Sequence, residues 1–409
     1  MKVLHYAYSV SKQSASYRIH RGLINNGVQS SLIVAAKSIN EKQIIQPRSS
    51  TEKLTSLLPL LTELFLKKVF KISEKAYFSI NKYQSALQQK WFSYSRSVTR
   101  DITHLHWVGN GFVSLLGLSK ISGPIVITLH DMWFLTGGCH VNLECHNYQY
   151  GCETCPRLGN KILGRNLTKS HFRNKSKFFQ NGDIEIIVLS SWMQDLALNS
   201  PMLKGIKIHL VPNGIDLNVF KPHNIIEARL LFNLPKNDSL ILFGGISALV
   251  DYNKGFDLLE RALKSFRGDR ESLKLITFGS TNVELSNIDG IPIINIGVLR
   301  DEVSLSALYS AVNLVVVPSR QESFSQISAE SISCGTPVVA FDHSGPRDII
   351  NHKENGFLAT PYDAQELTDG IEWLLKQDLR ESCRKIALER FDIDKIADKH
   401  IEIYQKLMS

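Results

Sequence analysis

Residues 318–348 read PSRQESFSQISAESISCGTPVVAFDHSGPRD, and this stretch decides the fold. An apolar run, Leu314–Val317, comes just before it, as expected of a strand buried on both faces of a sheet. A polar loop then leads into a predicted helix of about Ser325–Ser333, and Gly335 stands where a glycine often ends a helix. The next apolar run, Val338–Phe341, predicts a second buried strand. The stretch therefore predicts a strand–loop–helix–strand unit of a doubly wound sheet, in which ligands bind at the carboxyl ends of the strands.

Two carboxylates bracket the start of this predicted helix. Glu322 lies in the loop and Glu330 lies inside the helix, with seven residues between them. The amides of a first helical turn and the positive end of the helix dipole attract anionic oxygens, and a carboxylate accepts two hydrogen bonds from a vicinal diol. Either glutamate alone is compatible with a solvated surface residue, but the pair predicts a ligand with phosphate and several hydroxyls. The predicted ligand-binding residues here are Ser323, Phe324, Ser325, Gln326 and Glu330.

This arrangement resembles the E-x7-E motif of the retaining, GT-B fold glycosyltransferases of the GT4 family. The surrounding residues match this family as well, and they are Pro318-Ser319, Ala329-Glu330, Gly335-Thr336-Pro337-Val338-Val339 and Ser344-Gly345-Pro346. The resemblance covers about residues 210–390 well and the N-terminal half more loosely. It implies an α/β protein of the GT-B type, in which two Rossmann-like doubly wound domains face a central cleft.

The resemblance also implies roles for individual residues. Glu330 would hold the ribose diol of a nucleotide-diphosphate sugar, and Glu322 would lie near the sugar as part of the catalytic site. The turn at Gly245 and the catalytic Lys254 would hold the diphosphate, which fits a glycine turn and a lysine beside a helix start. A solvated Lys254 is the alternative. The family's second phosphate-binding cation has no matching residue here, so Arg320 is the candidate, and no cofactor is required for catalysis.

Two histidines follow predicted strands of the first half. His106 lies in the strand Ile102–Val108, and His130 comes directly after the strand Ile125–Leu129. In the resembled family a histidine at this place contacts the donor sugar or the reacting centre. The resemblance therefore implies a catalytic role for His130, and His106 is a second candidate; a purely structural histidine is the alternative. The first loop carries Ser14-Ala15-Ser16 where the family usually has a glycine pair.

Four cysteines follow these motifs with the spacing Cys-x5-Cys-x6-Cys-x2-Cys, and they are Cys139, Cys145, Cys152 and Cys155. This spacing can present four thiolates tetrahedrally, and soft sulfur ligands favour Zn²⁺. One interpretation is a compact structural zinc knuckle, and free thiols are the other. A catalytic zinc is disfavoured because a fourth thiolate would close the open position that catalysis requires. Similar cysteine-bearing insertions occur in some bacterial polysaccharide glycosyltransferases that the chain resembles.

The length of 409 residues is long for a single core and natural for two domains. We predict an N-terminal Rossmann-like acceptor domain at residues 1–212, with a cysteine-rich insertion at 137–158. A C-terminal Rossmann-like domain that binds the nucleotide sugar is predicted at residues 213–390. Residues 391–409 would form a helix that returns to the first domain.

The charge and the apolar pattern bear on the surroundings of the chain. The formal net charge of +8 fits nucleic acid, an anionic membrane surface or anionic substrates equally well. Because the sequence has neither an apolar run long enough to span a membrane nor a signal-peptide pattern at its start, we expect a cytoplasmic protein. Residues 52–95 combine leucines at helical spacing with lysines. They read either as a basic amphipathic helix on the inner face of the membrane or as helices packed on the sheet.

These observations predict a retaining glycosyltransferase that moves a sugar from a nucleotide-diphosphate sugar to a glycan or a lipid-linked saccharide. From the resemblance, its setting would be the synthesis of a capsule, an O-antigen or another cell-surface polysaccharide. A nucleotide-sugar epimerase of the same fold is the first alternative. A basic nucleic-acid-binding protein with a zinc knuckle is the second. It is disfavoured because the lysines are spread over both halves with no interleaved aromatic–basic motif, so no nucleic acid is expected as a partner.

Overall fold

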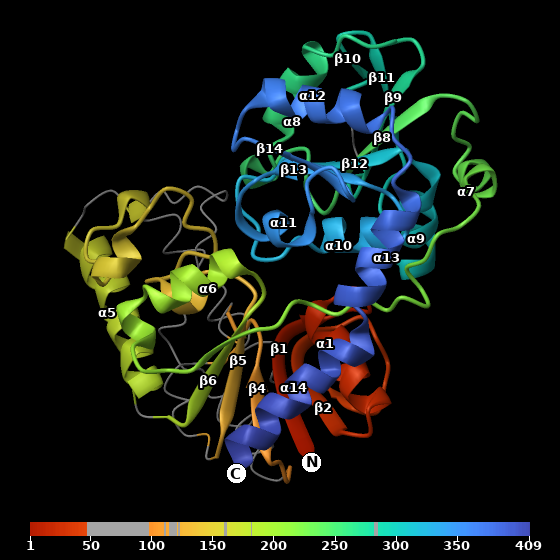
Figure 1. The fold of residues 1–409 in the computed structure, drawn as a ribbon. Coiled ribbons are helices and arrows are strands. Elements are labelled where there is room, and N and C mark those ends of the chain that lie inside the picture. Colours follow the sequence, from red (N-terminus) through yellow and green to blue (C-terminus); the bar gives the residue numbers. More distant parts are fainter. Residues whose placement is uncertain are drawn as a thin grey trace. The chain divides into compact units, whose positions relative to one another are not determined.

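The computed structural model describes residues 1–46, 98–109, 112, 113, 121, 123–158, 162–180, 182–281 and 285–409. The chain divides into two compact units. Unit 1 comprises Met1–Pro212 and Ile396–Ser409, and unit 2 comprises Asn213–Lys395. Each unit is built on a sheet with helices on its faces (Figure 1).

Unit 1 contains a seven-stranded sheet whose order is β3-β2-β1-β4-β5-β6-β7. Its strands are β1 (Lys2–Val10), β2 (Gln29–Lys37), β3 (Ile44–Ile45), β4 (Ile102–Leu105), β5 (Ile125–Leu129), β6 (Ile184–Val188) and β7 (Ile208–Leu210). All of the neighbouring pairs are parallel. The strand order reverses between β1 and β4, and such a switch point is where open α/β sheets bind ligands.

The helices of unit 1 connect and cover these strands. They are α1 (Ala15–Asn25), α5 (Ile162–Gln180), α6 (Ser191–Leu198) and α14 (Ile393–Met408), with short 3-10 turns at η2 (Trp133–Leu135), η3 (Asn147–Tyr150), η4 (Pro156–Leu158) and η5 (Pro201–Leu203). Helix α14 packs on the sheet because its apolar stripe, including Ile396, Ile403 and Tyr404, shares a buried cluster with β1, β4, β5 and β6. The C-terminal end of the chain is therefore part of unit 1.

Unit 2 contains a second seven-stranded sheet, with the order β10-β11-β9-β8-β12-β13-β14. Its strands are β8 (Ser239–Gly244), β9 (Leu273–Phe278), β10 (Asn287–Ile288), β11 (Ile291–Asn295), β12 (Leu314–Val317), β13 (Val338–Phe341) and β14 (Gly356–Ala359). The pairs are parallel except β10 with β11. Strands β12 and β13 are buried along their whole length, as their continuous apolar sequences predict.

The helices of unit 2 lie between these strands in the sequence. They are α7 (Ile225–Leu231), α8 (Phe256–Lys264), α9 (Glu302–Ala311), α10 (Gln326–Ser333), α11 (Ser344–Ile349), α12 (Ala364–Leu374) and α13 (Arg380–Arg390), with the 3-10 turn η6 (Tyr252–Lys254). Here the strand order reverses between β8 and β12, so the loops after these two strands meet at the switch point. The prediction of two doubly wound, Rossmann-like sheets is confirmed.

Two predictions concern membranes, and the described residues bear on only one of them. The segment 52–95, read as a membrane-surface or packed helix pair, lies outside the described residues. Among the helices that the structure describes, none is both long enough and apolar enough to cross a bilayer.

Candidate functional site

The centre of the candidate site in unit 2 is an ion pair between two strand-end loops. Lys254 closes η6 in the loop after β8, and Glu322 lies in the loop after β12. The Nζ of Lys254 lies 2.7 Å from Oε1 of Glu322, and both side chains are largely buried. The charge of Glu322 raises the pKa of Lys254, so the ammonium is fully charged at neutral pH. A cation is thus held where a ligand with anionic oxygens could compete with Glu322 for it.

The two loops are joined by their backbones as well as by the ion pair. Arg320 donates its amide to the carbonyl oxygen of Asn253 over 2.7 Å, and the Asn253 side chain donates to the carbonyl oxygen of Gln321 over 2.7 Å. Gly255 lies against Pro318 so closely that a Cβ there would stand 2.0 Å from the Pro318 carbonyl oxygen. Glycine at 255 is therefore required for the position of Lys254.

The segment that enters α10 is held in an unusual conformation. Ser325 caps α10 with a φ of +80°, a left-handed angle that is rare for a residue other than glycine. Gly345 packs against Phe324, and its amide donates to the carbonyl oxygen of Glu322 over 2.8 Å. The hydroxyl of Ser344 accepts from the amide of Glu322 over 3.1 Å. This clamp directs the start of α10, with its positive dipole end, toward the Glu322 loop.

Gln326, the first residue of α10, carries a polar group with no partner. Its side-chain Oε1 and Nε2 are both buried and make no hydrogen bond to any residue that the structure describes. A buried amide without partners is costly. Because these atoms are closed off from solvent, they do not by themselves point to a ligand, and the binding role of Gln326 stays a prediction.

Glu330 lies one turn further into α10 and is almost completely buried. Its Oε2 accepts a hydrogen bond of 3.0 Å from the hydroxyl of Tyr309 on α9. The hydroxyl fixes the direction of the carboxylate. Glu322 and Glu330 thus lie on either side of the helix start, as their spacing predicts.

Arg320 is engaged by groups of its own unit. Its guanidinium donates to both carboxylate oxygens of Asp257 over 2.9 and 2.6 Å and stacks 3.7 Å from the centre of the Tyr252 ring. Hydrogen bonds from Arg320 lower the pKa of Asp257. Its role as a second phosphate-binding cation stays a prediction, and binding a phosphate would require it to leave Asp257.

Unit 1 carries a pocket of about 160 Å³ at the carboxyl ends of β1 and β4. It is lined by Ala7, Tyr8, Ser9, Ser14, Ala15, Ser16, His106, Trp107 and His130. His130 reaches it from the end of β5, and its Nε2 lies 2.9 Å from Nδ1 of His106. Burial lowers the pKa of His130 to about 4, so the ring is neutral at pH 7. The structure therefore brings His130 and His106 together beside the serine-rich first loop.

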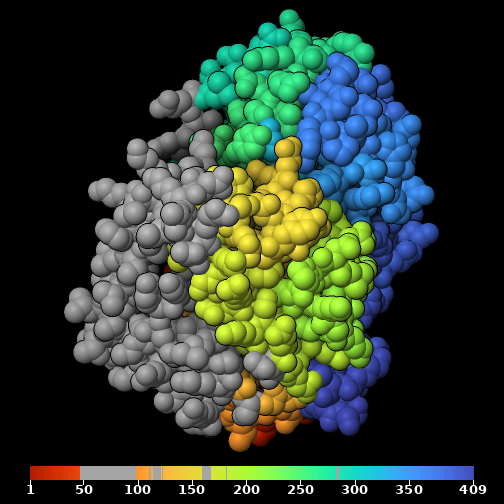
Figure 2. Space-filling view, turned by 90° about the vertical axis from the view of Figure 1, so that its left-hand side faces the viewer, coloured from red at the N-terminus to blue at the C-terminus, as the bar shows by residue number. Residues whose placement is uncertain are grey.

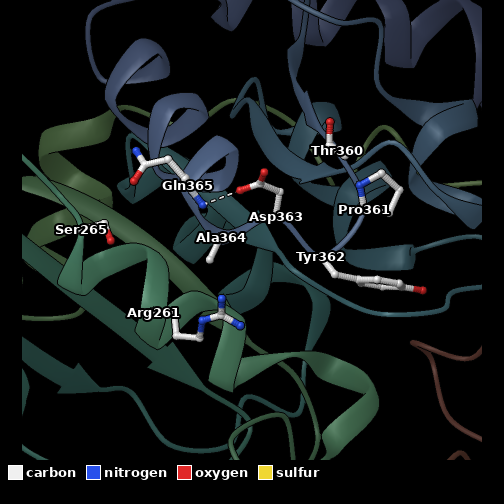
Figure 3. A pocket seen from close by; sticks show the side chains of 8 residues that line it. All are labelled: Arg261, Ser265, Thr360, Pro361, Tyr362, Asp363, Ala364 and Gln365. Atoms are coloured by element: carbon white, nitrogen blue, oxygen red, sulfur yellow. Dashed lines mark hydrogen bonds between the residues drawn. The ribbon is translucent and has the colours of Figure 1, made fainter.

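A larger pocket of about 510 Å³ in unit 2 contains none of the predicted residues (Figure 3). It is lined by Arg261, Ser265, Thr360, Pro361, Tyr362, Asp363, Ala364 and Gln365. Asp363 is already used there, since it caps α12 by accepting from the amide of Gln365 over 2.8 Å. The carboxylate of Asp363 is thus occupied by the start of α12.

The four cysteines lie in the segment after η2, which is at the surface of the molecule (yellow in Figure 2). Burial raises the pKa of Cys139 to about 12 and of Cys152 to about 11, and Cys152 Sγ accepts from the amide of Gly137 over 3.1 Å. Among the described residues, these four included, the metal-compatible group whose donor atoms all lie within 4.8 Å of one another is His5, His104 and His106. The zinc knuckle stays a prediction.

Comparison with known proteins decides the family. The model of the family Glycosyl transferases group 1 matches residues 229–390. A D-inositol 3-phosphate glycosyltransferase of Xylanimonas cellulosilytica is 32% identical over 328 residues, which cover 74% of this chain and 71% of that protein. The chain belongs to the group 1 glycosyltransferases. The sequence resemblance to GT4-type enzymes is confirmed at this level.

Solved structures place this group 1 glycosyltransferase in the GT-B fold. A sucrose-phosphate synthase of Thermosynechococcus elongatus superposes with a TM-score of 0.69 over 99% of this chain and 98% of that chain, at 18% identity. HepE of Anabaena, solved with UDP, superposes with a TM-score of 0.63 over 99% of this chain and 100% of that chain, also at 18% identity. The predicted GT-B fold is confirmed.

Some residues that support the site of this glycosyltransferase could not be recognised from the sequence. Asp257, Gln321 and Tyr309 act through contacts with residues that are 63, 68 and 21 positions away along the chain. His5 sits in an apolar strand and reads as a buried strand residue. Its position opposite His104 in the pairing of β1 with β4 becomes visible only in the sheet.

Proposed function

We propose that this glycosyltransferase moves a sugar from a nucleotide-diphosphate sugar to a saccharide acceptor with retention of the anomeric configuration. The observation that carries the proposal is the Lys254–Glu322 pair at the start of α10, with Glu330 one turn behind it. The solved complexes of HepE contain UDP and UDP-glucose, which supports the same class of donor here.

The division of labour follows from charge. Breaking the bond between sugar and phosphate leaves negative charge on the diphosphate and positive character on the anomeric carbon. Lys254 and the amides near Phe324–Gln326 stabilise the departing diphosphate, an effect that can exceed every other contribution to the rate. Glu322 then faces the sugar, and Glu330 accepts from the ribose diol. His130 contacts the reacting sugar or the acceptor, and no divalent cation is needed.

The acceptor is assigned by class. The net charge of +8 suits a lipid-linked saccharide on an anionic surface, at the inner face of the membrane, as in the synthesis of a capsule or an O-antigen. The name of the Xylanimonas relative specifies D-inositol 3-phosphate, which favours a phosphorylated polyol as the second acceptor class. A structural zinc on Cys139, Cys145, Cys152 and Cys155 remains part of the proposal, with no role in the chemistry.

A donor screen tests the proposed function. The purified chain is incubated with a panel of UDP-, GDP- and ADP-sugars and both acceptor classes, and the products are followed by proton NMR. We expect release of the nucleoside diphosphate with a product of unchanged anomeric configuration. Conversion of a sugar nucleotide without any acceptor would favour the epimerase instead. An inverted product would contradict the retaining mechanism.

The ribose assignment predicts the effect of Glu330→Gln on nucleotide binding. The substitution keeps the shape of the side chain and exchanges a charged acceptor for a neutral one, which weakens a hydrogen bond by about 1.4 kcal/mol. The Kd of the matching nucleoside diphosphate should therefore rise about tenfold, as measured by calorimetry. Tyr309→Phe is the matched control, because it removes the hydrogen bond to Glu330 but keeps the carboxylate. Unchanged affinity in Glu330→Gln would remove Glu330 from the nucleotide site.

A further inference from the structure

A chain of three imidazoles runs from the core of unit 1 to the pocket beside Ser14–Ser16. Nδ1 of His5 lies 3.0 Å from Nε2 of His106, and Nδ1 of His106 lies 2.9 Å from Nε2 of His130. His5 and His106 are almost fully buried, and His106 and His130 both line the pocket. The pairings of β1 with β4 and of β4 with β5 bring the three rings together. His5 lies in β1 opposite His104 of β4, and His130 comes directly after β5.

The three rings are neutral at pH 7, and this couples their protons. Burial lowers the pKa of His5 and His106 well below 6.5, and that of His130 to about 4. A neutral imidazole has one N–H, and each of the two hydrogen bonds needs one proton. All three rings must therefore point their protons in the same direction. Either every Nδ1 carries the hydrogen, or every Nε2 does.

The buried end of the row of imidazoles, which is His5, selects the direction in which the protons point. Nε2 of His5 has no hydrogen-bond partner among the residues that the structure describes. A proton there would be a buried donor without an acceptor, and such orphaned N–H groups are rarer than unpaired acceptors. His400 gives a precedent in the same unit. Its Nδ1 must donate to the Ile396 carbonyl oxygen, so its Nε2 is a lone pair, and that lone pair also has no partner in the described part of the chain.

We propose that His106, with His5 behind it, is a positioning residue that holds His130 neutral with its hydrogen on Nδ1. His130 is then a hydrogen-bond donor in the pocket and does not act as a base. A neutral imidazole donor binds a hydroxyl or phosphate oxygen and stabilises negative charge that develops there. The ligand that receives this hydrogen bond follows from the proposed function, and the form of the ring does not depend on it.

Hydrogen bonds also explain the neighbouring His104 without a metal ion. Its Nδ1 lies 2.6 Å from the hydroxyl of Tyr404, and its Nε2 lies 2.7 Å from Oγ1 of Thr128. A metal ion would need one lone pair from each of His5, His104 and His106. Both nitrogens of His106 are already engaged, so the ion would break one of its two hydrogen bonds, to His5 or to His130. A metal bound by these three rings would overturn the proposal.

The protonation state and the tautomer of His130 can be measured directly on the full protein without any ligand. Protein labelled with ¹⁵N-histidine is examined at pH 7.5 by long-range proton–nitrogen correlation, and His130→Asn assigns the signals of His130. We expect a neutral ring with the proton on Nδ1. In His106→Leu we expect the form with the proton on Nε2 to appear, because the donor to Nε2 is gone. His20→Leu is the control, since it removes another buried imidazole, one bonded to Ser30.

The outcomes separate this proposal from the proposed function. A wild-type His130 that is protonated on Nε2 or on both nitrogens would overturn it, as would a His106→Leu spectrum identical to the wild type. If His106→Leu does not fold, the wild-type spectrum and the metal content of the purified protein decide. If the spectrum is as expected but no sugar nucleotide is a substrate, the function fails and the assignment of the ring stands.

The rate of sugar transfer tests separately whether His130 donates a hydrogen bond to the ligand. The side-chain nitrogen of asparagine takes nearly the place of Nδ1, so His130→Asn keeps a donor that His130→Leu lacks. We expect kcat of His130→Asn to exceed that of His130→Leu by about tenfold, the value of one hydrogen bond to a developing charge. Equal losses in the two variants would contradict the donor role, because neither side chain can act as a base.

Discussion

Lys254→Ala is expected to lower kcat by at least about 100-fold, the usual effect of removing one stabilising group from a developing oxyanion. The ammonium lies at the switch point of the second sheet, 2.7 Å from Glu322, and that carboxylate raises its pKa further above the neutral range, so it stays charged. In the proposed reaction it meets the diphosphate as the bond to the sugar breaks. The measurement is steady-state release of nucleoside diphosphate at saturating donor. KM should change less than kcat, since the charge on the diphosphate grows in the transition state.

A matched control separates this effect from a general loss of charge. Lys264 forms an ion pair of 2.8 Å with Glu260 on the exposed side of α8, close to the 2.7 Å of the Lys254–Glu322 pair. Lys264→Ala removes the same charge from the same unit and should leave kcat within about threefold of the wild type, because exposed pairs contribute little. If Lys254→Ala also stays within that range, Lys254 does not stabilise the leaving group. If both variants lose activity equally, the effect is one of net charge.

The elements around the site could be predicted because their signals are local. The apolar runs of β12 and β13, the glycine at the end of α10 and the spacing of Glu322 and Glu330 are all contained in a few dozen adjacent residues. Parallel buried strands have continuous apolar sequences, and helix ends have their own residue preferences. These features place the start of α10 before any coordinates are known.

The contacts that hold the site in place could not be predicted, because they join residues that are far apart in the sequence. The pairing of Arg320 with Asp257 gives that arginine a structural partner, although the sequence made it a candidate for phosphate binding. The left-handed angle of Ser325 has no signal, since serine seldom adopts it. His5 is a polar residue in an apolar strand, and only the sheet register shows that its ring reaches His106.

Gly255→Ala should cause the largest loss of stability among substitutions by a single methyl group in this site. The residue has a φ of +72°, and an added Cβ would stand 2.0 Å from the carbonyl oxygen of Pro318. The left-handed angle costs about 1 kcal/mol for alanine, and displacing the facing backbone costs about 2 kcal/mol more. We expect a loss of about 3 kcal/mol in the free energy of unfolding, which lowers the Tm of a unit of this size by about 6–12 °C. Thermal unfolding followed by calorimetry measures it.

Gly290→Ala distinguishes the close contact from the backbone angle. Gly290 lies in the same unit with a similar φ of +84°, but a Cβ added there would meet nothing within 4 Å. Its alanine variant should lose only the cost of the angle, about 1 kcal/mol, or about 2–4 °C in Tm. The difference between the two variants therefore measures how tightly the loop after β8 is pressed against the loop after β12. Equal shifts would show that the Pro318 loop yields freely. The position of Lys254 beside Glu322 would then depend on the other contacts between the two loops, which include the ion pair, the Asn253 hydrogen bonds and the stacking of Arg320 on Tyr252.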